Sequence, residues 1–183
     1  MRVLAICGSL RAASLNRKLL RTAAELAPGG MVVEETGIRG IPVFDEDIEA
    51  KGLPDEVAAL RERCFAADGL LFVTPEYNYG IPGGLKNAVD WLSRRVDGKQ
   101  PFKDKPCAMM GASGGMGGTI RSQLQLRQSI QLLGALTMPG PEVFVAQANS
   151  RFDAEGKLTD APTRAAVEKL MAAFGQWIAR MKG

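Results

Sequence analysis

The feature that most constrains the fold is a regular alternation between short apolar runs and segments of helical periodicity. The runs at residues 2–7, 31–36, 69–74, 105–113 and 141–146 are typical of buried strands. Apolar side chains at helical spacing follow these runs at residues 15–26, 54–67 and 83–95, after the glycines of 114–118, and at 161–181. Strands that alternate with helices form a parallel sheet, because each connection must cross back over the sheet.

The number of elements and the right-handedness of such crossovers predict one α/β domain over residues 1–183. We expect a flavodoxin-like, five-stranded parallel sheet in the order 2-1-3-4-5, with helices on both faces. The chain has 183 residues, 46% of them hydrophobic, which is enough for one full core. Residues 37–54 carry turn residues and weak periodicity, so we predict an irregular connection there.

Composition argues against several kinds of protein. No apolar run is long enough to span a membrane, and the N-terminal residues show no secretory signal pattern, so we predict a cytoplasmic protein. The net charge is only +3, and the basic residues are scattered along the chain without a dense block. We therefore expect neither a nucleic-acid partner nor a membrane partner.

The chain contains no histidine. This absence removes Ser-His-Asp and Cys-His catalysis, most zinc sites and the side chain that most often transfers protons at neutral pH. Cys7, Cys64 and Cys107 are isolated in the sequence, and we interpret them as buried, reduced thiols. We predict no metal site and no catalytic side chain, so an enzyme of this composition takes its chemistry from a bound cofactor.

Three unusual stretches follow the first, third and fourth predicted strands, beginning at Gly8, Thr74 and Ala112. In doubly wound sheets, ligands bind outside the carboxyl ends of the strands, where the strand order reverses. With the order 2-1-3-4-5 these three loops meet at that point. The sequence therefore predicts one composite site.

The first loop, "GSLRAASLN", offers hydroxyls at Ser9 and Ser14, a cation at Arg11 and an amide at Asn16, just before a helix begins. Such donors at a helix N-terminus suit a phosphate. Neither the P-loop pattern nor G-x-G-x-x-G is present, which favours a terminal monophosphate. The alternative is simple helix capping by Ser14 beside a solvated Arg11.

The second loop, "TPEYNYGIPGG", contains both tyrosines of the chain, Tyr77 and Tyr79, between stiffening prolines. Their rings offer large faces with polar tips, and the N–H groups of Glu76, Tyr77 and Asn78 suit the polar edge of a planar ring. The alternative is a tight turn with core tyrosines.

The third loop, "GASGGMGGT", has five glycines in nine residues. Bare backbone of this kind suits close contact with a ligand, and the alternative is a flexible loop. A monophosphate site, a ring platform and a glycine floor together describe flavin mononucleotide, FMN. We also expect the N–H groups of Ser113, Gly114 and Gly115 to stabilise negative charge on the reduced ring.

The stretches "GSLRAASLN" and "TPEYNYGIPGGLKNAVDW" resemble the NADPH-dependent FMN reductases, a family that includes bacterial chromate or quinone reductases and small azoreductases. One departure is the pair Gly83 and Gly84, where a single glycine was expected. The resemblance implies bound FMN, with phosphate contacts along the first loop and ring contacts along the other two. The implied contacts are Ser9, Arg11, Ser14, Leu15, Asn16, Pro75, Glu76, Tyr77, Asn78, Tyr79, Ser113, Gly114 and Gly115.

The resemblance also implies hydride transfer from NADPH or NADH, through FMN, to a small-molecule acceptor such as a quinone, a free flavin, chromate or an azo compound. We expect a ping-pong mechanism and a homodimer or homotetramer. Candidate interface residues lie on the helices after Gly84 and Gly118, the alternative being that they pack only on their own sheet. These residues are Leu85, Val89, Leu92 and Leu126.

Two other functions fit the same fold. A flavodoxin-type electron carrier shares the cofactor but usually needs an acidic docking face, and this chain is slightly basic. A regulatory domain that binds a nucleotide or a sugar phosphate is the second. No acidic or basic residue that discriminates NADH from NADPH is legible in the sequence.

Overall fold

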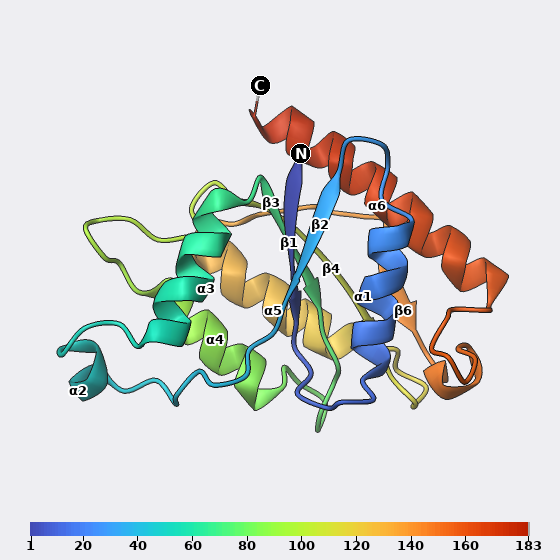
Figure 1. Cartoon of the computed structure of the whole chain (residues 1–183), viewed down its shortest axis with the longest axis horizontal. Helices are drawn as coiled ribbons and strands as arrows, with labels where there is room; N and C mark the ends of the chain where they lie inside the picture. The colour runs from blue at the N-terminus through green and yellow to red at the C-terminus, as the bar shows by residue number, and fades with distance from the viewer. Residues whose placement is uncertain (183) are drawn as a thin grey trace.

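The apolar runs form one parallel sheet, whose central strands are buried on both faces. The computed structural model describes residues 1–182, and its strand order is β2-β1-β3-β4-β5, with β6 also paired to β4. This confirms the predicted flavodoxin-like order (Figure 1). The strands are β1 Arg2–Cys7, β2 Val32–Thr36, β3 Gly69–Val73, β4 Pro106–Ala112, β5 Leu136–Thr137 and β6 Val143–Val145.

Helices cover both faces of the sheet, as the alternating pattern predicted. The helices are α1 Leu15–Glu25, α2 Glu46–Glu49, α3 Asp55–Ala66, α4 Gly83–Ser93, α5 Ile120–Leu132 and α6 Ala161–Lys182, with a 3-10 turn at Ala148–Ser150. Helices α1 and α6 pack on one face, while α3, α4 and α5 pack on the other (Figure 1). Alternate residues of β1 divide between these two cores, because successive side chains of a strand point to opposite faces.

The predicted fifth strand at residues 141–146 is present as β6, but the fifth position in the sheet also holds the unpredicted strand β5. Two short strands occupy that position: β5 pairs with the first residues of β4 and β6 with the last. Pro139 and Pro141 separate them, and a proline has no N–H with which to continue the ladder. Splitting the strand still leaves β6 beside the carboxyl end of β4, where the third loop begins.

The connection between β2 and α3 is less irregular than predicted, because it contains the short helix α2. Asp45 caps this helix, and its carboxylate accepts a hydrogen bond from the N–H of Asp47 at 2.8 Å. The side-chain amide of Asn87 on α4 holds the same connection. It accepts from the N–H of Phe44 and donates to the carbonyl of Pro42, both at 2.8 Å.

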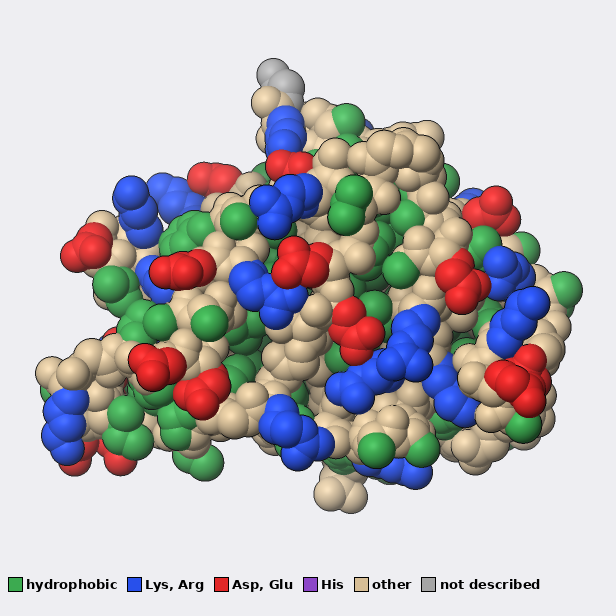
Figure 2. All heavy atoms as spheres, viewed as in Figure 1, with side chains coloured by type: hydrophobic (Ala, Val, Ile, Leu, Met, Phe, Trp, Pro, Cys, Tyr) green, Lys and Arg blue, Asp and Glu red, His purple; other side chains and the backbone are tan. Residues whose placement is uncertain are grey.

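Acidic and basic side chains lie next to one another on the face drawn in Figure 2. Around β2, Glu34 pairs with Arg2 and Arg63, and Glu35 pairs with Arg17 and Arg21. Exposed pairs of this kind each stabilise the fold by at most about 1 kcal/mol. Within residues 1–182, no helix is both long enough and apolar enough to cross a membrane.

Candidate functional site

The loops after β1, β3 and β4 meet at the carboxyl edge of the sheet and line one open hollow. Most of the residues predicted for FMN binding line it, together with Ala112. They are Ser9, Arg11, Ser14, Leu15, Asn16, Pro75, Glu76, Tyr77, Ser113 and Gly114. Asn78, Tyr79 and Gly115 are not among the lining residues. Three segments far apart in the sequence therefore form one site.

The first loop presents donors to this hollow at the start of α1. Ser14 is the N-cap of the helix, and its hydroxyl accepts from the N–H of Arg17 at 3.2 Å. The N–H groups of Leu15 and Asn16 make no hydrogen bond within residues 1–182, and both residues line the hollow. Arg11 is exposed and has no carboxylate partner in the same range. Ser14 therefore caps the helix, and the N–H groups of Leu15 and Asn16 remain without a partner beside it.

Asn16 has a different environment from the one predicted. Its side chain is buried, its Nδ2 donates to the carbonyl of Ala112, and its Oδ1 accepts from the N–H of Ala112, both at 2.8 Å. Both ends of the amide are therefore engaged with the last residue of β4. Asn16 joins the first loop to the third, which a contact with phosphate alone would not do.

The second loop turns back on itself between Tyr77 and Gly80, which exchange both backbone hydrogen bonds, at 3.0 and 3.2 Å. Asn78 and Tyr79, at the turn, have φ values of +49° and +66°, a region that bulky residues rarely adopt. The N–H of Tyr77 is thus already paired and is not free for a ring, contrary to our expectation. Tyr77 is 48% exposed beside the hollow, whereas the Tyr79 ring stacks on the Arg121 guanidinium at 3.8 Å.

Glu76 fixes the second loop to helix α5. Its carboxylate accepts from the N–H of Arg121 at 2.9 Å and of Ser122 at 3.3 Å, and also pairs with the Arg121 guanidinium. The N-cap residue, Thr119, provides no side-chain cap, so Glu76 takes that role from a distant part of the chain. An anion at a helix N-terminus is also favoured by the helix dipole.

The third loop offers fewer donors than predicted. The N–H of Ser113 donates to the carbonyl of Val145 at 2.9 Å, and the N–H of Gly115 donates to the Ser113 hydroxyl at 3.1 Å. The expectation that Ser113, Gly114 and Gly115 all present free N–H groups is therefore wrong. Within residues 1–182, only Gly114 keeps an unpaired N–H among the three, and Gly114 lines the hollow.

Residues 1–150 match the family model described as NADPH-dependent FMN reductase. The chain belongs to the NADPH-dependent FMN reductase family. It is 45% identical to an NAD(P)H-dependent FMN reductase of Pseudomonas aeruginosa, over 100% of this chain and 98% of that one. It is also 40% identical to a quinone reductase of Escherichia coli K12, over 100% of this chain and 97% of the relative.

Solved structures agree with this assignment. The NAD(P)H:acceptor oxidoreductase FerB of Paracoccus denitrificans superposes with a TM-score of 0.89 at 34% identity, over 98% of each chain. A flavodoxin from the domain Archaea superposes with a TM-score of 0.63 at 8% identity, over 98% of this chain and 99% of that one, and supports the fold alone. As a member of the FMN reductase family, the chain is an NAD(P)H-dependent enzyme whose cofactor is FMN.

The donors at the hollow fit FMN. A phosphate needs unpaired N–H groups and a cation, which Leu15, Asn16 and Arg11 present, and a planar ring needs a flat apolar wall, which Pro75 and Tyr77 present. Among residues 1–182 there is no cluster of His, Cys, Asp or Glu that would hold a metal ion.

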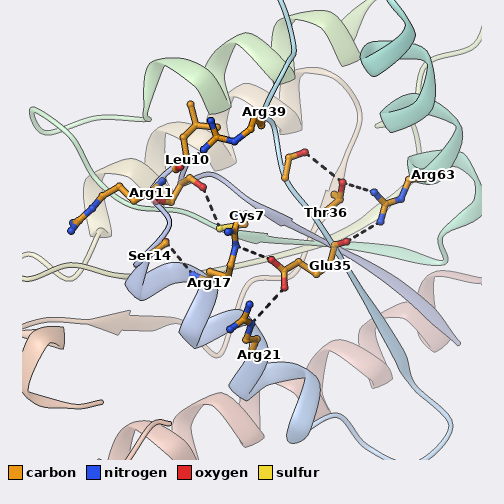
Figure 3. Close-up of polar contacts among 12 residues, drawn as sticks. Cys7, Leu10, Arg11, Ser14, Arg17, Arg21, Glu35, Thr36, Arg39 and Arg63 are labelled. Atoms are coloured by element: carbon orange, nitrogen blue, oxygen red, sulfur yellow. Dashed lines mark hydrogen bonds and ion pairs between the residues drawn. The ribbon is translucent and has the colours of Figure 1, made fainter. Parts of the chain in front are cut away.

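The three thiols of this FMN reductase are unpaired and buried, as predicted. Burial raises the pKa of Cys7 and of Cys107, and raises that of Cys64 to about 12. Thiols in this state are protonated at neutral pH and are poor nucleophiles. Cys7 lies at the end of β1, just before the first loop (Figure 3).

A second open hollow, which no sequence signal indicated, lies beside the first. It shares Arg11 and Tyr77 with the first hollow, and Ile38 reaches it from the connection after β2. No sequence signal marked Ile38, because that connection has no clear periodicity. Its lining residues are Gly8, Leu10, Arg11, Ile38, Tyr77, Pro82, Gly83 and Gly84.

The residues proposed for a subunit interface are buried within this chain. Leu85, Val89, Leu92 and Leu126 all pack into the core under α3, α4 and α5. The alternative, that they pack on their own sheet, is therefore the correct one. The helix periodicity was right, but it marked the inner face.

Proposed function

We propose that this FMN reductase transfers hydride from NAD(P)H to quinones by a ping-pong mechanism, with nicotinamide and acceptor using one site in turn. When bound, FMN supplies the two-electron chemistry, so the chain needs no redox side chain of its own. The observation that carries the proposal is the single hollow lined by all three loops. The chain is 40% identical to a quinone reductase over 97% of that relative, and this similarity supports a quinone as the acceptor.

In this proposal each loop has one task. The first loop binds the phosphate through Ser9, Arg11, Ser14 and the N–H groups of Leu15 and Asn16. The second holds the ring against Pro75 and Tyr77, with Glu76 positioning the loop through α5. The third donates one hydrogen bond to the ring from Gly114. Ser113 shapes the loop through its paired N–H and hydroxyl, while Asn78, Tyr79 and Gly115 lie beyond the hollow and act on it only through the loops they belong to.

The proton that accompanies hydride transfer comes from water in this mechanism. No histidine is present, and the Glu76 carboxylate is held by three donors on α5. If Glu76 carried protons between the substrate and the solvent, its carboxylate would have to break those hydrogen bonds in every catalytic cycle. The protein's contribution is orientation and the exclusion of competing reactions.

The test is steady-state oxidation of NADPH by the FMN-loaded protein with menadione as the acceptor. We expect parallel double-reciprocal lines, because the oxidised nicotinamide leaves before the quinone binds. Lines that intersect would contradict the ping-pong order, and an absence of turnover would favour the electron-carrier alternative. Chromate, an azo dye and free flavin tested in the same assay would establish which other acceptors react.

Tyrosine variants give a matched comparison for the ring platform. Tyr77→Leu removes the ring beside the hollow, and we expect it to weaken FMN binding by about tenfold or more, given the usual 1–3 kcal/mol for an aromatic stack. Tyr79→Leu removes the ring that stacks on Arg121, outside the hollow, and should leave FMN binding nearly unchanged. Equal losses in both variants would contradict the division of tasks.

We also propose that the enzyme forms a homodimer or homotetramer in the cytoplasm. Helix α5 carries exposed apolar side chains at Ile120, Leu124 and Leu132, of which Leu124 is 52% exposed. These side chains lie outside the core that Leu126 enters, and such exposed apolar groups are a candidate contact between copies. Sedimentation of wild type and Leu124→Glu at micromolar concentration tests this, and a monomeric wild type would refute it.

A further inference from the structure

We propose that the hollow beside the flavin site receives the adenosine end of NADPH, and that Arg39 binds its 2′-phosphate. This enzyme then prefers NADPH to NADH. The inference rests on the proposed function, because it takes the nicotinamide to react at the neighbouring flavin site. It assigns to one arginine a choice that the sequence left open.

The shape of the surface supports this location. A dinucleotide whose nicotinamide lies at the flavin must continue along an adjoining surface. The second hollow adjoins the flavin site, since Arg11 and Tyr77 line both. Its remaining lining is largely apolar or bare backbone, from Leu10 and Ile38 together with Gly83 and Gly84. Such a wall suits the flat face of an adenine and the close approach of a sugar.

Arg39 is not a lining residue of this hollow, but its side chain contacts one that is. Its Nη2 donates to the carbonyl of Leu10 at 2.6 Å, so the side chain reaches back from the connection after β2 to the first loop (Figure 3). The residues on either side of this contact, Leu10 and Ile38, are both lining residues. One hydrogen bond fixes the guanidinium there and leaves its other N–H groups free.

The charge of Arg39 is also uncompensated, unlike that of the other arginines in Figure 3 near β2. Arg17, Arg21 and Arg63 each pair with Glu34 or Glu35. Arg39 has no carboxylate within 4.0 Å among residues 1–182. A planar guanidinium with free N–H groups matches a phosphate dianion, which is the one group that distinguishes NADPH from NADH.

No acidic residue lines the hollow. Enzymes that select NADH commonly bind the ribose 2′-hydroxyl through an Asp or Glu, which would repel the 2′-phosphate. Arg11 also borders the hollow, but in our proposal its charge is used by the FMN phosphate. Arg39 is therefore the residue left to discriminate between the two coenzymes.

The experiment measures the binding of adenosine 2′,5′-bisphosphate and of AMP to the FMN-loaded protein by titration calorimetry. These two ligands differ only in the 2′-phosphate and do not react, so binding is read separately from turnover. Wild type, Arg39→Gln and Arg95→Gln are compared. Arg95 is the matched control, because it is exposed and has no carboxylate partner, and it lies near Lys103, before the start of β4 and away from the flavin edge.

We expect wild type and Arg95→Gln to bind the bisphosphate about ten- to a hundredfold more tightly than AMP, the range for charge-assisted hydrogen bonds. Arg39→Gln should lose that difference and raise KM for NADPH by a similar factor, with KM for NADH and FMN content unchanged. Arg39→Lys should restore part of the difference in affinity between the two ligands.

Equal binding of both ligands to wild type, or an unchanged difference in Arg39→Gln, would overturn the proposal. A parallel rise in KM for NADH would also overturn it, since Arg39 would then act only through Leu10. If the wild-type protein binds the bisphosphate more tightly than AMP but does not turn over quinone, the proposed function is refuted and the role of Arg39 is not.

Discussion

Asn16 offers the sharpest test of how the three loops are joined. Its buried amide pairs with both the N–H and the carbonyl of Ala112 at 2.8 Å. Asn16→Leu keeps a similar volume and excludes water, so both groups of Ala112 lose their partner. An unpaired buried polar group costs about 1–3 kcal/mol, so the two together predict a loss of about 2–6 kcal/mol in unfolding free energy. For a chain of this length that is roughly 5–20 °C in Tm.

The matched control is Asn87→Leu. Asn87 makes the same pair of bonds, to Phe44 and Pro42, but it is only half-buried and lies on α4 away from the flavin hollow. Both variants should be less stable in urea unfolding, Asn87→Leu by the smaller amount. Only Asn16→Leu should weaken FMN binding, because only that change releases the first loop from the third. If Asn16→Leu keeps wild-type stability and loses only FMN, the amide serves the ligand and our reasoning fails.

Asn16→Asp adds a pH signature. The introduced carboxylate accepts from the N–H of Ala112 but has no proton to donate to its carbonyl, so folding raises the pKa of that carboxyl. A raised folded pKa gives extra stability that is complete below the unfolded value of about 3.9 and disappears as the pH rises through the folded value. The stability gap to wild type should therefore narrow on acidification. A gap that is constant from pH 7 to pH 4 would contradict this.

Three further predictions test other parts of the molecule. Arg11→Ala should weaken FMN binding about ten- to a hundredfold in a flavin fluorescence titration, as expected for a charge-assisted bond to phosphate, without changing the Tm of the FMN-free protein. Gly111→Ala should destabilise the fold by about 1–3 kcal/mol or more in urea, because the added Cβ would lie 2.2 Å from the carbonyl oxygen of Thr74; full stability would refute the packing. The Lys182 ammonium above all holds the pKa of Asp68 low, and that stabilisation is present above about pH 4 and lost on acidification through the folded pKa. Asp68→Asn should thus cost at most about 1 kcal/mol at pH 7, because the pair is partly exposed, and less at acidic pH, as measured by urea unfolding at both pH values.

The sequence predicted the sheet because apolar periodicity records which faces are buried. The runs in β1, β3 and β4 are buried at nearly every position, as continuous apolar runs in parallel sheets should be. The fifth position was harder to predict, since Pro139 and Pro141 split it into β5 and β6. Periodicity also marked Leu85 and Leu126 as apolar helix positions, but it could not distinguish a face buried against the sheet from a face buried against another subunit.

The sequence by itself determined the three loops and the chemistry that they suit. The strand order brings the carboxyl ends of β1, β3 and β4 to one edge of the sheet, whatever contacts the individual loop residues make. Only the tertiary structure decided which donors are free. The side-chain amide of Asn16 and the N–H groups of Tyr77 and Ser113 donate to other backbone groups, whereas the N–H groups of Leu15, Asn16 and Gly114 do not. It also brought Arg39 to Leu10, across 29 positions of the chain. The physical reason is that a hydrogen bond satisfies a polar group once, and which partner it takes depends on contacts between segments that are distant in sequence.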